Sequence, residues 1–208
     1  QSHYATTPNG ARFKKRQQGF LPEILENLYD ERVLWKNKMI EYQKEFESTD
    51  DPKRKQELNR QIAIAYNNQM VRKISLNSAY GAIGNEWFRY FELSLAEAVT
   101  SSGQLAIKWV EKAVNMYLNT ILDTEDDYVV AIDTDSIYVR FDELIKKVNP
   151  KNPVDFLDQV ANGKMQEVIN KCYEDLADYT NAYQNKMNMG REVIADKGIF
   201  VAKKRYAL

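Results

Sequence analysis

The stretch Tyr128–Phe141 reads Tyr-Val-Val-Ala-Ile-Asp-Thr-Asp-Ser-Ile-Tyr-Val-Arg-Phe, and the rest of the sequence is best interpreted outward from it. Two runs rich in β-branched and aromatic residues flank Asp133-Thr134-Asp135, which predicts a β-hairpin with its acidic residues at the turn. Side chains two positions apart in an extended chain point to the same side, so Asp133 and Asp135 would share one small patch. Crowded carboxylates raise each other's pKa unless a cation neutralises them. Such hard oxygen ligands suit Mg²⁺ or Mn²⁺, and an ordinary polar turn is the alternative interpretation.

The overall composition is ordinary for a globular protein of one large domain or two small ones. The chain has 208 residues, of which 44% are hydrophobic and 28% are charged. We see no apolar run long enough to cross a membrane, and we expect a cytoplasmic location. One Cys and one His make a structural zinc site implausible.

Charge is unevenly distributed along the chain, although the net charge is only −1. Residues 1–75 carry 14 Lys and Arg against 10 Asp and Glu, whereas residues 76–208 carry 15 against 20. This asymmetry fits a phosphate-binding arm on a metal-binding base. A chance fluctuation in a solvated surface is the alternative.

The first half of the sequence predicts a short hairpin or loop over residues 1–20, followed by two long helices. Pro22 suits the first turn of a helix that continues to about Phe46. Asp51 is a good N-cap and Pro52 a good first residue for a second helix, which ends near Tyr80 and Gly81. Two long helices joined by a short loop predict an antiparallel helical hairpin.

Cationic and polar side chains share faces of these two helices. Arg32 and Lys36 are four residues apart on the first helix, and Lys73, Asn77 and Tyr80 follow a helical spacing on the second. If the two faces converge, they form a cationic pocket for a polyphosphate. The alternative is that both are solvated helix faces.

The second half predicts further helices and a final hairpin. A helix over about Leu93 to Asn119 would bury a stripe of side chains, and a later helical region would extend to about Tyr179 with Cys172 in its core. Two strands, Arg191–Ala195 and Ile199–Ala202, are predicted around the turn Asp196-Lys197-Gly198. The predicted stripe consists of Leu105, Trp109, Ala113 and Met116.

Three motifs in this order resemble those of family B DNA polymerases, the polymerase-alpha-like class, and most closely the replicative enzymes of tailed phages. Lys73-Ile74-Ser75-Leu76-Asn77-Ser78-Ala79-Tyr80-Gly81 resembles the fingers motif. Asp133-Thr134-Asp135-Ser136 resembles the palm metal motif. Lys203-Lys204-Arg205-Tyr206 resembles the basic motif that contacts the primer. The resemblance covers nearly the whole chain.

The resemblance implies an α+β fold, with a helical-hairpin fingers subdomain at 21–83 on a partial palm at 84–208 and a palm-edge segment at 1–20. It also implies a template-directed DNA polymerase that uses two Mg²⁺ or Mn²⁺ ions, with primer–template DNA and dNTP as partners. Asp133 and Asp135 would be the catalytic and metal-binding acids, and Glu192 matches a further palm carboxylate. The nucleotide-binding positions would be Arg32, Lys36, Lys73, Asn77 and Tyr80, and the DNA-binding positions Asn85, Lys203, Lys204, Arg205 and Tyr206.

The family's first metal motif, an Asp followed by Ser-Leu-Tyr-Pro, does not occur in this sequence. We therefore expect a further polymerase segment that carries this Asp, the exonuclease and the thumb, and we expect the isolated chain to be inactive without it. If the protein is of phage origin, its location would be the cytoplasm of the infected host. The alternative function is a non-catalytic module that binds nucleotide or DNA on a palm-like fold.

Overall fold

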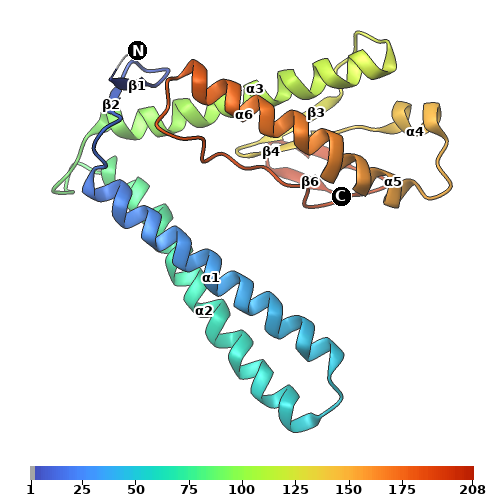
Figure 1. The fold of residues 1–208 in the computed structure, drawn as a ribbon, viewed down its shortest axis with the longest axis horizontal. Coiled ribbons are helices and arrows are strands. Elements are labelled where there is room, and N and C mark those ends of the chain that lie inside the picture. Colours follow the sequence, from blue (N-terminus) through green and yellow to red (C-terminus); the bar gives the residue numbers. More distant parts are fainter. Residues whose placement is uncertain (1–2) are drawn as a thin grey trace. The chain divides into compact units, whose positions relative to one another are not determined.

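Residues 3–208 are described by the computed structural model, which separates into two units (Figure 1). The helical unit comprises residues 16–97, and the mixed unit comprises residues 3–15 together with 98–208. Long helices and small antiparallel sheets make this an α+β protein, which confirms the predicted fold class.

The helical unit is built on a hairpin of two long helices, α1 (Phe20–Ser48) and α2 (Pro52–Ile83). The predicted start of α2 is confirmed, because the Asp51 side chain accepts a hydrogen bond from the backbone N–H of Lys53 and Pro52 occupies the first turn. α2 continues past Gly81 and ends at Ile83, with Gly84 as its C-cap. Both helices were thus predicted to within a few residues.

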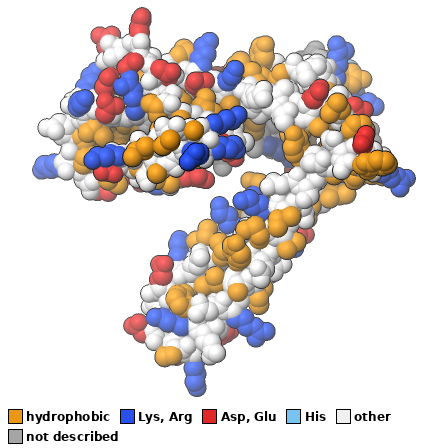
Figure 2. Space-filling model, turned by 180° about the vertical axis from the view of Figure 1, so that it is seen from behind, with side chains coloured by type: hydrophobic (Ala, Val, Ile, Leu, Met, Phe, Trp, Pro, Cys, Tyr) orange, Lys and Arg blue, Asp and Glu red, His pale blue; other side chains and the backbone are white. Residues whose placement is uncertain are grey.

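The interior of this helical hairpin is small. Leu58, Ala65 and Gln69 are the buried residues of α2, and α1 has none. Large apolar side chains remain exposed along the hairpin, as Figure 2 shows for one face. The hairpin is also held by ion pairs between its helices, of Arg54 with Glu45 and of Arg72 with Glu31, each at 2.6 Å.

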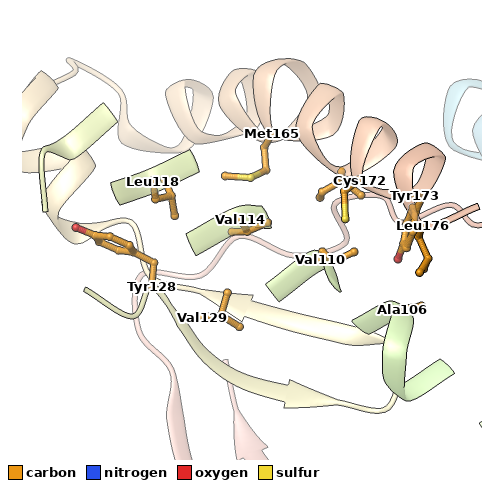
Figure 3. Close-up of a cluster of buried hydrophobic side chains, with 11 residues drawn as sticks. Ala106, Val110, Val114, Leu118, Tyr128, Val129, Met165, Cys172, Tyr173 and Leu176 are labelled. Atoms are coloured by element: carbon orange, nitrogen blue, oxygen red, sulfur yellow. The ribbon is translucent and has the colours of Figure 1, made fainter. Parts of the chain in front are cut away.

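The mixed unit has its core between two helices, α3 (Leu93–Leu122) and α6 (Gln166–Tyr179), and the first residues of a β-hairpin (Figure 3). Residues spaced by four on α3 present one apolar face to α6. Cys172 lies in this core, as predicted, and its burial raises the pKa of the thiol to about 11. The buried cluster consists of Ala106, Val110, Val114, Leu118, Tyr128, Val129, Met165, Ile169, Cys172, Tyr173 and Leu176.

The predicted core stripe of α3 was wrong by about one position. The centre of the buried face is formed by Ala106, Val110, Val114 and Leu118. Leu105, Trp109 and Ala113 lie at its margin, partly buried against the core, and Met116 is 61% exposed. Successive residues on a helix differ by about 100° in direction. When the apolar face is broad, the sequence pattern alone therefore does not identify which residues are most deeply buried.

Three two-stranded antiparallel sheets complete the mixed unit. β1 (Tyr4–Thr6) pairs with β2 (Arg12–Lys14), which confirms the hairpin predicted in residues 1–20. β3 (Val129–Asp133) pairs with β4 (Ser136–Val139), which confirms the hairpin with acidic residues at its turn. β5 (Ile199–Ala202) pairs with β6 (Arg205–Ala207).

The predicted strand Arg191–Ala195 is wrong, and so is the turn at residues 196–198. These residues are irregular, and Arg191 forms an ion pair with Asp158. The strand Ile199–Ala202 is correct, but it pairs with Arg205–Ala207 across a turn at Lys203 and Lys204. Local strand propensity was right for β5 and could not identify its partner, because pairing depends on which side chains the hairpin packs against.

Shorter helical segments connect β4 to α6. α4 (Asp142–Val148) was not predicted, although acidic residues in its first turn and lysines in its last turn complement the helix dipole. α5 (Pro153–Val160) begins after the N-cap Asn152, and the segment Ala161–Met165, which kinks at Gly163, joins it to α6. Within residues 3–208, no helix combines the length and apolarity that crossing a membrane requires.

Candidate functional site

The acidic turn, residues Asp133 to Asp135, lies at the tip of the β3–β4 hairpin. Asp133 opposes Ser136 in the register, and the backbone N–H of Asp135 donates to the carbonyl oxygen of Asp133 at 2.7 Å. Thr134 has a φ of +55°, which is unusual for a β-branched residue. Its hydroxyl donates to Asp133 Oδ1 at 3.2 Å. The turn is therefore held in a strained conformation beside a carboxylate that it helps to orient.

The basic turn, Lys203 and Lys204, lies at the tip of the β5–β6 hairpin and contacts the acidic turn. Lys204 also has a positive φ, of +61°. Its Nζ lies 3.5 Å from Asp133 Oδ1, and the Tyr206 hydroxyl donates to Asp133 Oδ2 at 3.3 Å. Both carboxylate oxygens of Asp133 are thus paired with groups of the other hairpin. The structure brings together three of the residues that the sequence identified, from two separate motifs.

These contacts shift the pKa values of Asp133 and Tyr206. Partial burial raises the pKa of Asp133, but the hydroxyl of Thr134 and the Lys204 and Tyr206 side chains lower it by more, so it lies below its ordinary value. A hydrogen bond with Tyr138, burial and the nearby Asp133 raise the pKa of Tyr206 to about 12. At neutral pH Asp133 is therefore a carboxylate, and the Tyr206 phenol that faces it is neutral.

An aromatic cluster of Tyr138, Phe200 and Tyr206 joins the two hairpins beneath these turns. The Tyr138 ring centroid lies 5.2 Å from that of Phe200 and 5.0 Å from that of Tyr206, both edge-to-face. The ring centroids of Phe200 and Tyr206 lie 5.7 Å apart. Sequence reasoning did not identify Tyr138 as part of the site. The only signal was its position in the alternating pattern of β4, which directs it to the face opposite that of Ile137 and Val139.

The carboxylates of the acidic turn fit only part of a metal site. Oxygen ligands suit Mg²⁺ or Mn²⁺, and the side chain of Asp135 is exposed with no hydrogen bond or ion pair to other residues in 3–208. However, no group of three carboxylate, His or Cys side chains suited to a metal ion occurs in the described part of the chain. Glu192 is exposed in the irregular segment before β5 and does not join the two aspartates in such a group.

The predicted nucleotide-binding residues belong to the helical unit. Lys36, Lys73, Asn77 and Tyr80 are exposed, which leaves them available to a ligand. Arg32 is partly buried, and its Nε is fully buried with no hydrogen-bond partner among the residues described. A buried unpaired donor is costly, so this Nε is a polar atom that the described residues leave unsatisfied.

The remaining predicted DNA-binding residues are accessible. Asn85 follows the C-cap of α2, where its side chain accepts a hydrogen bond from the backbone N–H of Trp87 at 3.0 Å. Its side chain is thereby oriented, and Trp87 itself is 86% exposed. Lys203 and Arg205, on either side of Lys204, are exposed.

Comparison with known proteins gives a consistent result along the whole chain. The family model for DNA polymerase family B matches residues 1–208. The DNA-directed DNA polymerases of Enterobacteria phage T4 and Escherichia phage RB69 are 33% and 34% identical to the chain, with 99% of the chain covered in each case. DNA polymerase 1 of Pyrococcus abyssi is 28% identical over 96% of the chain. The chain spans only 29% of the T4 protein, 28% of the RB69 protein and 20% of the Pyrococcus protein.

Proposed function

The chain belongs to DNA polymerase family B, and on this premise we propose that it is a segment of a DNA polymerase catalytic core. The reaction would be template-directed addition of dNTPs to a primer 3′-hydroxyl. The observation that carries the proposal is the meeting of the acidic and basic turns at Asp133, where Lys204 and Tyr206 contact one carboxylate. This combination would put an anionic site for metal ions beside a cationic site for DNA phosphate.

We assign subdomains within the bounds that the sequence predicted, which differ from those of the two compact units at residues 16–20 and 84–97. The helical hairpin within 21–83 would be the fingers, residues 84–208 the partial palm, and residues 1–20 its edge. The palm would contribute the reaction centre, and the fingers would contribute groups that bind the incoming nucleotide. This division of labour suits phosphoryl transfer, which depends on positioning and charge neutralisation more than on a protein nucleophile.

In the palm, Asp133 and Asp135 would provide carboxylate ligands, with Asp135 as the more available one. When bound there and to a further carboxylate, two Mg²⁺ ions would supply charge neutralisation for the attacking and leaving oxygens. Glu192 is the candidate within this chain for an additional ligand. The further carboxylate would come from the polymerase segment with the first metal-binding Asp, in a protein that also carries an exonuclease and a thumb.

The basic turn would hold the primer end. Lys204 and Tyr206 can donate to phosphate oxygens, and Lys203 and Arg205 would add positive charge beside them. In the structure the same donors face Asp133. Binding of a primer phosphate would then redistribute these donors between the phosphate and the carboxylate.

In the fingers, Arg32, Lys36 and Lys73 would contact the triphosphate of the incoming dNTP. Asn77 and Tyr80 lie one and two turns further along α2 from Lys73, which suits contact with the sugar and the nascent base pair. Asn85 would lie near the template.

The proposal can be tested by the affinity of the chain for fluorescent primer–template DNA, measured by anisotropy at several salt concentrations. We expect Lys204→Ala to weaken binding and to reduce its salt dependence by about one ion. Lys151→Ala, at an exposed lysine of the connector before α5, is the matched control and should have little effect. An equal loss of DNA affinity in both variants, or no loss in either, would contradict the assignment of the basic turn.

A non-catalytic nucleotide- or DNA-binding module is the second candidate function. It is favoured by the lack of a three-carboxylate group within residues 3–208. The two candidates differ in a chimera of the T4 phage polymerase in which this chain replaces the matching segment. Primer extension by that chimera, abolished by Asp135→Asn, would support the catalytic role. Stable binding of DNA and dNTP without extension would support the module.

A further inference from the structure

The β5–β6 hairpin carries the basic turn, yet it is poorly anchored by burial. Every residue of both strands is exposed, and the sheet has only these two strands. Isolated two-stranded hairpins are at best marginally stable in water. The hairpin therefore depends on its contacts with the rest of the mixed unit for a defined position.

Polar contacts and ring contacts fix the hairpin to β3–β4, and they differ in strength. The polar contacts include the long 3.3 Å hydrogen bond from the Tyr206 hydroxyl to Asp133. The ion pair of Lys204 with Asp133 has a long separation of 3.5 Å and a lysine side chain that is 64% exposed, so it contributes little on its own. The ring contacts of Tyr138 with Phe200 and Tyr206 have centroid separations in the favourable edge-to-face range. These rings come from both β5 and β6, so a single side chain of β4 contacts both strands.

The alternation of β4 explains why Tyr138 is placed there. Ile137 and Val139 pack against the core of the mixed unit, whereas Tyr138 points to the opposite face. The core thus fixes β4 from one side, and Tyr138 projects from this fixed strand to the other hairpin. Tyr138 lies three residues after Asp135, so the same strand positions both the acidic turn and the ring that meets the basic turn.

We propose that Tyr138 is a positioning residue, whose ring contacts with Phe200 and Tyr206 hold the basic turn against Asp133. Its role in DNA binding rests on the proposed polymerase function, but its role in placing the hairpin does not. The Tyr138 hydroxyl also shares a hydrogen bond with Tyr206, but that bond reaches only β6. The ring contacts both β5 and β6, so we expect the ring to carry most of the effect. Tyr138→Phe should therefore preserve the arrangement, and Tyr138→Leu should lose it.

The first experiment measures hydrogen exchange of the β5–β6 backbone in the full chain without DNA. In Tyr138→Leu we expect exchange in residues 199–207 to be about tenfold faster, because two aromatic contacts are lost. Tyr138→Phe should remain within about twofold of the wild type, and exchange in the β1–β2 hairpin should not change. Tyr183→Leu is the matched control, since Tyr183 is 73% exposed and lies outside the aromatic cluster. Unchanged exchange of residues 199–207 in Tyr138→Leu would overturn the proposal.

The second experiment distinguishes positioning from general stability by a double-mutant cycle on primer–template affinity. We expect Tyr138→Leu and Lys204→Ala each to weaken binding, and the double variant to bind about as tightly as Lys204→Ala alone. If the two fold-losses of affinity multiply in the double variant, Tyr138 does not act through Lys204. That result would overturn the proposed coupling. If the wild type fails to bind primer–template DNA, the polymerase proposal fails, and the exchange experiment still decides the role of Tyr138.

Discussion

At the scale of single residues, the strained backbone of Thr134 has a measurable cost. A β-branched residue at positive φ costs about 1–2 kcal/mol, whereas Asn tolerates this conformation. We expect Thr134→Asn to raise the free energy of unfolding by about 0.5–1 kcal/mol, measured by urea titration. Thr134→Val is the informative control, because it keeps the branched shape and removes the hydroxyl that donates to Asp133. A Thr134→Asn variant no more stable than the wild type would mean that the surroundings, and not the side chain, determine this turn.

The lowered pKa of Asp133 predicts a pH dependence of stability. The carboxyl has a folded-state pKa below its ordinary value of 3.8, so its ionised form favours the folded state. This stabilisation is present above the unfolded-state pKa and is lost as the pH falls through the folded-state value. We expect the stability difference between wild type and Asp133→Asn to be larger at pH 6 than below pH 3. Urea titrations at both pH values measure it, and a pH-independent difference would contradict the prediction.

At the scale of elements, the hairpin of α1 and α2 should be sensitive to its few buried side chains. Leu58 is fully buried, so Leu58→Ala should destabilise the chain by about 2–5 kcal/mol. Ile64→Ala lies on the same helix at a residue that is 45% exposed, and we expect a much smaller effect there. Circular dichroism during urea unfolding would follow both variants. Similar losses of unfolding free energy in the two variants would show that the stability of the hairpin does not depend on its few buried side chains.

The exposed cations of the same hairpin lead to a prediction about ligand choice. If Lys73 contacts a triphosphate, Lys73→Ala should weaken binding of a nucleoside triphosphate by about fivefold and leave monophosphate binding nearly unchanged. Asn77→Ala should affect both ligands, because that residue is proposed to contact sugar and base. Lys53→Ala, at the other end of α2, is the control. Titration calorimetry at moderate salt is the measurement, and equal affinities of mono- and triphosphate for the wild type would exclude the proposed pocket.

At the scale of the whole molecule, the incomplete set of carboxylates predicts an inactive isolated chain. The part of the chain that the structure describes offers no three-carboxylate group for metal ions. We therefore expect no measurable primer extension by the 208-residue chain with primer–template DNA, dNTPs and Mg²⁺. The chimera with the phage T4 polymerase serves as the positive control for the assay. Robust extension by the pure chain would show that Asp133 and Asp135 suffice or that another residue completes the site.

Much of this molecule follows from local signals in the sequence. Asp51 with Pro52 marked the start of α2, and the alternating runs around Asp133 marked the β3–β4 hairpin. What local signals could not provide were contacts between distant segments. Tyr138 contacts residues 200 and 206 across two hairpins, and the local sequence of neither hairpin reveals that contact. The partner of β5 was misassigned for the same reason. Family resemblance identified the acidic and basic motifs separately, and their meeting at Asp133 was not predicted.

The burial of Cys172 has a practical consequence for studies of this chain in solution. Because it is the chain's single cysteine and its thiol has a pKa of about 11, the folded protein should react very slowly with alkylating reagents. The thiol can then be alkylated only when the α3–α6 core opens, so the labelling rate reports how often that core opens. Mass spectrometry of a single alkylated site could time core opening in the mixed unit without any added probe. Unfolding confined to the helical unit would leave the labelling rate of this thiol unchanged.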